Sequence, residues 1–219
     1  MSGEPITGAD IVAPRAEFRP PEPYGPSVSD ERFAKLARGI NINNWFGQPY
    51  NAKVRGKKGG FNSEHIRAYI TERDAERLKA AGFTHIRLPM DPQVFMDTST
   101  GELKPDLLPD LLWGIELFTD RGFAVIVDAH PKMPTFKAMN RKPELEKNFI
   151  TWWENFAGWA HENTDPELVF LELLNEPGGQ KYWSQTYPPY QDKLIMAARK
   201  GAPHHTLVAN PGGWQSVDY

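Results

Sequence analysis

The stretch Ala124-Val-Ile-Val127 is apolar at four successive positions, and Leu168-Val-Phe-Leu171 repeats the pattern further along the chain. Strands covered on both faces of a parallel sheet read as continuous apolar runs rather than alternating ones. Similar short runs recur elsewhere in the sequence. The five expected strands are Arg38–Asn43, Phe83–Leu88, Phe123–Asp128, Leu168–Leu174 and His205–Ala209.

Helix-like segments separate these strands. Thr71-Glu-Arg-Asp74 has the pattern of a capping box and predicts a helix that ends at Gly82. Further helices are expected around Leu111–Phe118, ending at Gly122, from Pro143 to Phe156, and from Tyr187 to Ala202. Strands that alternate with helices in this way predict an α/β fold with a parallel sheet.

Two architectures contain such a sheet, a (β/α)8 TIM barrel and an open doubly wound sheet. A nucleotide-binding open sheet is typically marked by a glycine-rich phosphate turn after its first strand, but here Asn43-Asn-Trp-Phe46 follows that strand. Polar residues gather at the carboxyl ends of the expected strands, where barrel enzymes carry their chemistry. We therefore predict the barrel.

The spacing of the strands predicts an incomplete barrel. The expected strand centres, Ile40, Ile86, Ile126, Leu171 and Val208, are 46, 40, 45 and 37 residues apart. Eight such units would need on the order of 330 residues, whereas the chain has 219. We expect a barrel truncated after its fifth strand over residues 31–219. Residues 1–30 are rich in proline, and we expect them to form an extended arm or linker.

The composition is that of an ordinary globular protein. Lys and Arg number 25 against 28 Asp and Glu, a net charge of −3, which argues against a nucleic-acid or anionic-membrane partner. No run approaches the ~18 apolar residues of a membrane span, and we see no signal peptide pattern at the start of the chain. The absence of cysteine excludes disulfides, thiolate metal ligands and cysteine nucleophiles.

Three expected strand ends carry polar residues suited to the mouth of a barrel. They are His85-Ile-Arg87, Asp128-Ala-His130 and Asn175-Glu-Pro177. Hydrolysis of a glycosidic bond needs a protonated carboxyl beside the leaving oxygen and a second carboxylate below the anomeric carbon. Glu176 is the candidate for the protonated carboxyl.

Structural interpretations of the same residues remain open. Glu176 could be an exposed loop carboxylate, and Arg87 could be a buried partner of Glu172 that closes the barrel. His130 could be a packed histidine. For Asp128 we favour a structural role, with its carboxylate bound to backbone groups inside the barrel.

Taken together, these strand ends resemble glycoside hydrolase family 5, the cellulase family of a large clan of retaining barrel enzymes. The matching stretches are Arg38-Gly-Ile-Asn-Ile-Asn43, His85-Ile-Arg-Leu-Pro89, Val125-Ile-Val-Asp-Ala-His130, Phe170-Leu-Glu-Leu-Leu-Asn-Glu-Pro177 and Val208-Ala-Asn-Pro-Gly-Gly-Trp214. The resemblance implies that Glu176 is the general acid/base and that Asn175 binds the sugar 2-hydroxyl at the cleaved subsite. It also implies that Arg87 orients the nucleophile and that His130 lines the same subsite.

The family's nucleophile is a glutamate at the end of the seventh strand, beyond the five strands expected here. Glu172 cannot replace it, because it lies in the middle of the strand that carries Glu176. We therefore expect this chain to lack the nucleophile and to hydrolyse little on its own, unless a partner supplies the missing C-terminal part of the barrel.

Tryptophans on the loops at a barrel mouth suit stacking against sugar rings. Trp45 and Trp214 are expected to bind substrate in this way, and Tyr182 and Trp183 lie beyond the fourth strand. The tryptophans expected in the core are Trp113, Trp152, Trp153 and Trp159, and the basic residues expected in a solvated loop are Lys53, Arg55, Lys57 and Lys58.

The leading function is an endo-acting glycoside hydrolase that cleaves β-1,4-glucan by double displacement, with a β-linked polysaccharide or oligosaccharide as its partner. Alternatives are a β-mannanase or another β-glucanase of the family, and a non-catalytic carbohydrate-binding fragment. Metal-dependent hydrolysis through His85, Asp128, His130 and Glu176 is a weaker alternative because no metal-binding spacing occurs. We expect no cofactor or metal, and the resemblance implies a secreted or periplasmic protein.

Overall fold

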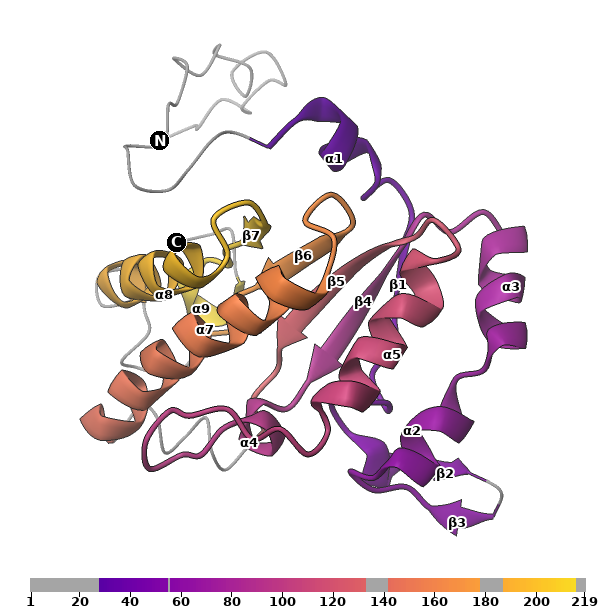
Figure 1. Cartoon of the computed structure of the whole chain (residues 1–219), viewed down its shortest axis with the longest axis horizontal. Coiled ribbons are helices and arrows are strands. Elements are labelled where there is room, and N and C mark those ends of the chain that lie inside the picture. The colour runs from indigo at the N-terminus through magenta and orange to yellow at the C-terminus, as the bar shows by residue number, and fades with distance from the viewer. Residues whose placement is uncertain (1–27, 55, 133–141, 178–186, 216–219) are drawn as a thin grey trace, which may run out of the picture.

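The computed structural model describes residues 28–54, 56–132, 142–177 and 187–215. Its central sheet has five parallel strands, each paired with the next in chain order (Figure 1). They are β1 (Gly39–Asn41), β4 (His85–Met90), β5 (Ala124–Ala129), β6 (Val169–Glu172) and β7 (Thr206–Val208). All five strands expected from the sequence are confirmed. The strand order does not reverse, so these strands contain no switch point of a doubly wound sheet.

Helices follow the strands and cover one face of the sheet. The longer ones are α3 (Glu72–Ala80), α5 (Leu108–Thr119), α7 (Pro143–Asn163) and α8 (Tyr187–Gly201). The shorter ones are α1 (Asp30–Ala34), η1 (Pro49–Asn51), α2 (Ser63–Tyr69), α4 (Pro92–Phe95) and α9 (Gly212–Gln215). In Figure 1, α5 and α7 run across the sheet, α1 lies near the amino ends of the strands, and α4 lies near their carboxyl ends.

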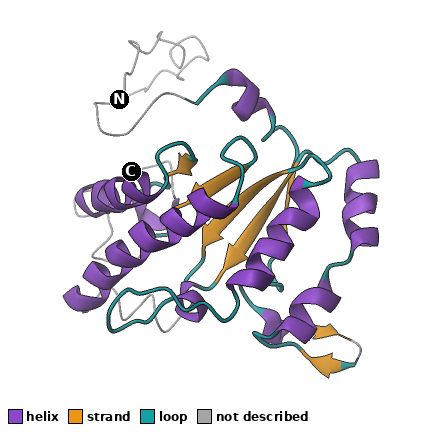
Figure 2. Cartoon of the chain, in the orientation of Figure 1, coloured by secondary structure: helices purple, strands orange, loops and turns teal. Residues whose placement is uncertain are grey.

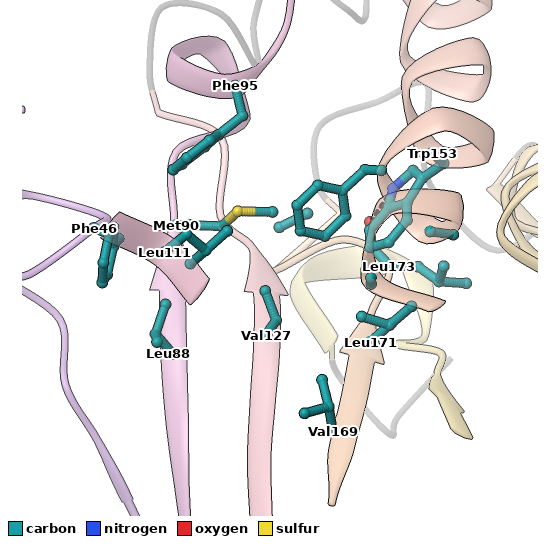
Figure 3. Close-up of a cluster of buried hydrophobic side chains, with 14 of the residues drawn as sticks. Phe46, Leu88, Met90, Phe95, Leu111, Val127, Trp153, Val169, Leu171 and Leu173 are labelled. Carbon is teal, nitrogen blue, oxygen red and sulfur yellow. Dashed lines mark hydrogen bonds between the residues drawn. The ribbon is translucent and has the colours of Figure 1, made fainter. Parts of the chain in front are cut away.

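The two faces of the sheet differ in chemistry. Leu88, Val127 and Leu171 point toward the helices and belong to the main hydrophobic core, which Figure 3 shows around Trp153 and Phe95. The opposite face, which we call the inner face, carries a small apolar cluster of Ala124, Ile126 and Phe170, with Leu36 and Val208 beside it. The alternation of side chains along a strand places Arg87, Asp128 and Glu172 on this inner face as well.

Local signals in the sequence set the helix ends. Thr71 and Asp74 form the expected capping box at the start of α3, and the chain leaves that helix through Gly82 at a φ of 80°. Gly122, at a φ of 73°, follows α5 in the same way. Positive φ costs a residue with a Cβ atom free energy but costs glycine little, which explains why both helices end where the sequence predicts.

Several short elements were not expected from the sequence. Lys53–Val54 (β2) and Lys57–Lys58 (β3) form a small antiparallel hairpin apart from the main sheet (Figure 2), where a loop was expected. The lysines are exposed, as expected, and Arg55 lies outside the described residues. Helices α1 and α2 were also missed, because their five and seven residues are too short to show a periodic pattern.

Helix α1 is held by Arg32 at the amino end of β7. The guanidinium of Arg32 donates to the backbone oxygen of His204 at 2.8 Å and pairs with Glu167. The proposed arm of residues 1–30 falls almost wholly outside the described residues, and α1 begins at its border. Within the described part of the chain, no helix is both long and apolar enough to cross a membrane.

Trp153 joins the core to the strand end that carries Asn175. Its side chain is fully buried, and its indole N–H donates to the backbone oxygen of Leu173 at 2.9 Å. We expect Trp153→Ala to lower the free energy of unfolding by about 3–5 kcal/mol, because it leaves a large cavity. Trp153→Phe retains a ring and removes only the N–H, so its loss should be smaller. Urea denaturation measures both, and a wild-type midpoint for Trp153→Ala would contradict this packing.

Candidate active site

Arg87 lies at the centre of a polar network on the inner face of the sheet. Its Nε and Nη2 donate to the two carboxylate oxygens of Glu172, both at 2.7 Å. Its Nη2 also lies 2.8 Å from Oδ2 of Asp128. A buried guanidinium cannot lose its charge, so it needs such carboxylate partners. The expected Arg87–Glu172 pair is therefore present, and Asp128 joins it.

Asn175 and His130 extend the network toward the carboxyl ends of the strands. Nη2 of Arg87 donates to Oδ1 of Asn175 at 2.8 Å, and Nδ2 of Asn175 lies 3.2 Å from Nε2 of His130. Nδ1 of His130 lies 2.8 Å from Oδ2 of Asp128. Three of the residues expected to contact one sugar, Arg87, His130 and Asn175, are thus brought together, with Asn175 linking the other two.

Asp128 differs from its expected role. Its carboxylate is fully buried, and its partners are the side chains of Arg87 and His130 rather than the expected backbone groups. The preference for backbone partners was therefore wrong. The reason is geometric, because β4 and β5 pair with Pro89 opposite Asp128. This register places the carboxylate near the guanidinium two residues earlier on β4.

Two asparagines also belong to the network but were not singled out as site residues. Nη1 of Arg87 donates to Oδ1 of Asn41 at 3.0 Å. Nδ2 of Asn210 donates to Oε1 of Glu172 at 2.6 Å and to the backbone oxygen of Leu174 at 2.9 Å. Both lie in quoted stretches at or just beyond a strand end, which was the available signal. The network thus draws on all five strands or their carboxyl ends.

Glu176 has an unusual backbone. Its φ is 44°, the left-handed region that non-glycine residues rarely adopt, and it is the only such non-glycine residue among those described. Proline follows it, and a residue before proline is normally driven to extended conformations. Strain of this kind costs about 1–3 kcal/mol and clusters at functional sites. The Glu176 side chain is exposed.

The charges of the network act on one another. Burial by itself would lower the pKa of Arg87, but the hydrogen bond with Glu172 and the charges of Asp128, Glu172 and Glu176 raise this pKa above its ordinary value. The negative charge of Glu176 is therefore felt at the guanidinium. Burial, together with the charge of Glu172, raises the pKa of Asp128 to about 6, against the lowering effect of the hydrogen bond from His130 and of the Arg87 charge.

Trp45 is not a substrate platform, which corrects the sequence-based expectation. Its side chain is fully buried, its ring packs against Phe46 and Phe118, and its indole N–H donates to the backbone oxygen of Ile66 at 2.8 Å. The loop after β1 folds under α2, so the tryptophan enters the core. The side chain of Trp214, like Tyr182 and Trp183, lies outside the described residues.

The tryptophans expected in the core are found there or packed against it. Trp152 and Trp153 are fully buried, while Trp113 and Trp159 are partly buried against the same core.

Among the described residues, no group of three or more histidine, aspartate or glutamate side chains is arranged to hold a metal ion. His85 lies at the amino end of β4, where its ring packs over Gly39.

Known proteins resemble this chain in sequence. The sequence profile of the cellulase family, glycosyl hydrolase family 5, matches residues 46–218. Endoglucanase C of Acetivibrio thermocellus is 32% identical over 146 residues, which cover 63% of this chain and 39% of the relative. Cellodextrinase A of Ruminococcus flavefaciens is 24% identical over 184 residues, covering 79% and 49%.

Solved structures agree on the fold. Thermotoga maritima Cel5A in complex with cellobiose superposes with a TM-score of 0.69 at 22% identity, covering 86% of this chain and 56% of that chain. The same protein in complex with mannotriose has the same TM-score and coverage. The matched part of the chain therefore spans between 39% and 56% of the length of these relatives and structures.

The raised pKa of Asp128 makes stability depend on pH. An exposed aspartate titrates near ~3.9, so the folded protein holds this proton more tightly than the unfolded chain. The contribution of Asp128 is then fully present below about pH 4 and is lost as the pH rises through about 6. Relative to Asp128→Asn, the wild-type protein should lose stability across this interval.

Denaturant midpoints at a series of pH values measure the effect. Asp106→Asn, at an exposed position, is the matched control and should leave the pH profile of the wild type unchanged. A constant difference between wild type and Asp128→Asn across the interval would contradict the raised pKa.

Proposed function

Because this chain belongs to glycosyl hydrolase family 5, we propose that it carries the acid/base half of a retaining endo-β-1,4-glucanase. The observation that carries the proposal is the placement of Asn175 and Glu176. Asn175 is locked to Arg87 and His130, and the next residue is a carboxylate with a strained backbone at the carboxyl end of β6. In a parallel barrel, this end of the strands is where enzymes place their chemistry.

The five strands correspond, in this proposal, to the first five of a closed (β/α)8 barrel. Two features support it: the strands follow one another in chain order, and the chain covers 56% of a matched structure from the same family. A second carboxylate, from a part of the barrel beyond the described strands, would act as the nucleophile. The chain alone would then bind a sugar without completing the reaction.

The reaction proceeds in two displacements. Protonated Glu176 donates its proton to the leaving glycosidic oxygen while the second carboxylate attacks C1 and forms a glycosyl ester. Glu176 is then an anion and removes a proton from water, which attacks C1 and releases the sugar with net retention. Arg87, held by Glu172 and Asp128, keeps a fixed positive charge that interacts with the charge of Glu176.

The proposed substrate is a β-1,4-linked glucan. The curated relatives are an endoglucanase and a cellodextrinase, and a matched structure holds cellobiose. A related structure holds mannotriose, so β-mannan is the second candidate. The alternative of a non-catalytic carbohydrate-binding fragment predicts that the complete protein binds cellulose but does not cut it.

Replacing the acid/base tests the proposal in the complete protein that contains this chain. We expect Glu176→Gln to lower kcat on cello-oligosaccharides by about 10²–10⁴-fold, the usual contribution of a general acid or base. On an aryl cellobioside with an acidic phenol, the rate of the first displacement should fall much less, because that leaving group needs no proton. Release of the phenol and of reducing sugar measures the two steps.

Glu116→Gln is the matched control, because Glu116 is an exposed glutamate on α5. It should retain wild-type rates on both substrates. Equal rates for Glu176→Gln and the wild type on cello-oligosaccharides would refute the acid/base assignment. Retention on a cellulose column by a wild-type protein that releases no sugar would favour the binding fragment instead.

A further inference from the structure

Four side chains of the network form a closed ring of contacts. Arg87 contacts Asn175, Asn175 contacts His130, His130 contacts Asp128, and Asp128 contacts Arg87, at separations of 2.8, 3.2, 2.8 and 2.8 Å. Two members of this ring, Asn175 and His130, can each present either a donor or an acceptor to a neighbour. The direction of every hydrogen bond in the ring must therefore be set by the other two.

Arg87 sets the direction on one side. A guanidinium has only donors, so the atom of Asn175 that faces it must be the amide oxygen. The amide nitrogen of Asn175 then faces Nε2 of His130, and because that nitrogen is a donor, Nε2 must carry a lone pair rather than a proton. Neutral His130 must therefore carry its proton on Nδ1.

Asp128 sets the direction on the other side. Its Oδ2 lies 2.8 Å from Nδ1 of His130 and accepts the hydrogen bond from the Nδ1 proton that the contact with Asn175 requires. The other oxygen, Oδ1, is buried and has no hydrogen-bond partner among the described residues. Oδ2 of Asp128 thus accepts from His130 and also forms the ion pair with Arg87.

We propose that Asp128 is a positioning residue for Asn175 and acts through the tautomer of His130. Holding the proton on Nδ1 keeps Nε2 an acceptor, and this fixes the amide of Asn175 with one N–H on His130 and the second N–H free of partners among the described residues. The free N–H is a donor to a sugar hydroxyl, so the hydroxyl at this position must accept. This last step rests on the proposed function, whereas the tautomer does not.

The tautomer is measured directly in the 219-residue chain, without any hydrolysis. Long-range proton–nitrogen spectra of the ¹⁵N-labelled protein at about pH 8, where histidine is neutral, distinguish the two tautomers by their nitrogen shifts. His130→Gln identifies the signals of His130. We expect the wild type to show the Nδ1–H form, and a wild-type Nε2–H form would overturn the proposal.

Two variants separate a positioning role from a packing role. Asp128→Asn can place its amide oxygen where Oδ2 lies and its nitrogen where Oδ1 has no partner, so the Nδ1–H form should persist. Asp128→Leu fills a similar volume without an acceptor, and the Nε2–H form should then become populated. Retention of the pure Nδ1–H form in Asp128→Leu would show that Asn175 alone sets the tautomer and would overturn the role of Asp128.

The complete protein provides the second measurement. We expect Asp128→Leu to lower kcat/KM on cello-oligosaccharides by at least about tenfold, the factor that corresponds to one hydrogen bond to the transition state. Asp128→Asn should lose less. If Asp128→Leu does not fold, the Nε2–H form in the wild-type or the Asp128→Asn spectrum would still overturn the proposal. An inactive wild type with the Nδ1–H tautomer would count against the proposed function and leave the role of Asp128 intact.

Discussion

The structure of the inner face depends on one permanent positive charge. Arg87 is buried to the extent that only 25% of its side chain is exposed, and it cannot be neutralised by losing a proton. Burying such a charge is unfavourable unless carboxylates and further hydrogen-bond acceptors surround it. Glu172, Asp128, Asn41 and Asn175 are the groups that do so here. Because a guanidinium offers only donors, it also orders the polar groups beyond its own contacts.

That constraint explains why the site is built across several strands. Glu172 on β6 accepts from Arg87 on β4 and from Asn210 beyond β7, so one carboxylate links β6 to its neighbour β7 and, across β5, to β4. The parallel register brings these positions together, because each strand reaches the same edge of the sheet at its carboxyl end. A functional site placed there is supported by backbone pairing as well as by its own charges.

The sequence predicted those features that depend on local pattern. Short β-branched or apolar runs identified all five strands, and the capping box of Thr71 and the glycines after α3 and α5 marked helix ends. It failed where tertiary packing decides. A tryptophan on a loop, such as Trp45, can face solvent or core, and only the fold of α2 over it determines which. The side-chain partners of Asp128 likewise depend on strand register, which one sequence does not encode locally.

The end of β6 shows how the backbone brings neighbouring residues to one site. Residues alternate between faces along a strand, yet Leu173 and Leu174 both belong to the main core, so the alternation breaks at Leu174. Asn175 then lies on the inner face, where its backbone N–H donates to Ala129 at 2.9 Å and its side chain contacts Arg87. With that residue held at both its backbone and its side chain, the left-handed φ of Glu176 turns the chain immediately afterwards. The strained conformation is therefore a consequence of presenting an amide and a carboxylate in succession at the edge of the sheet, which an extended strand cannot do.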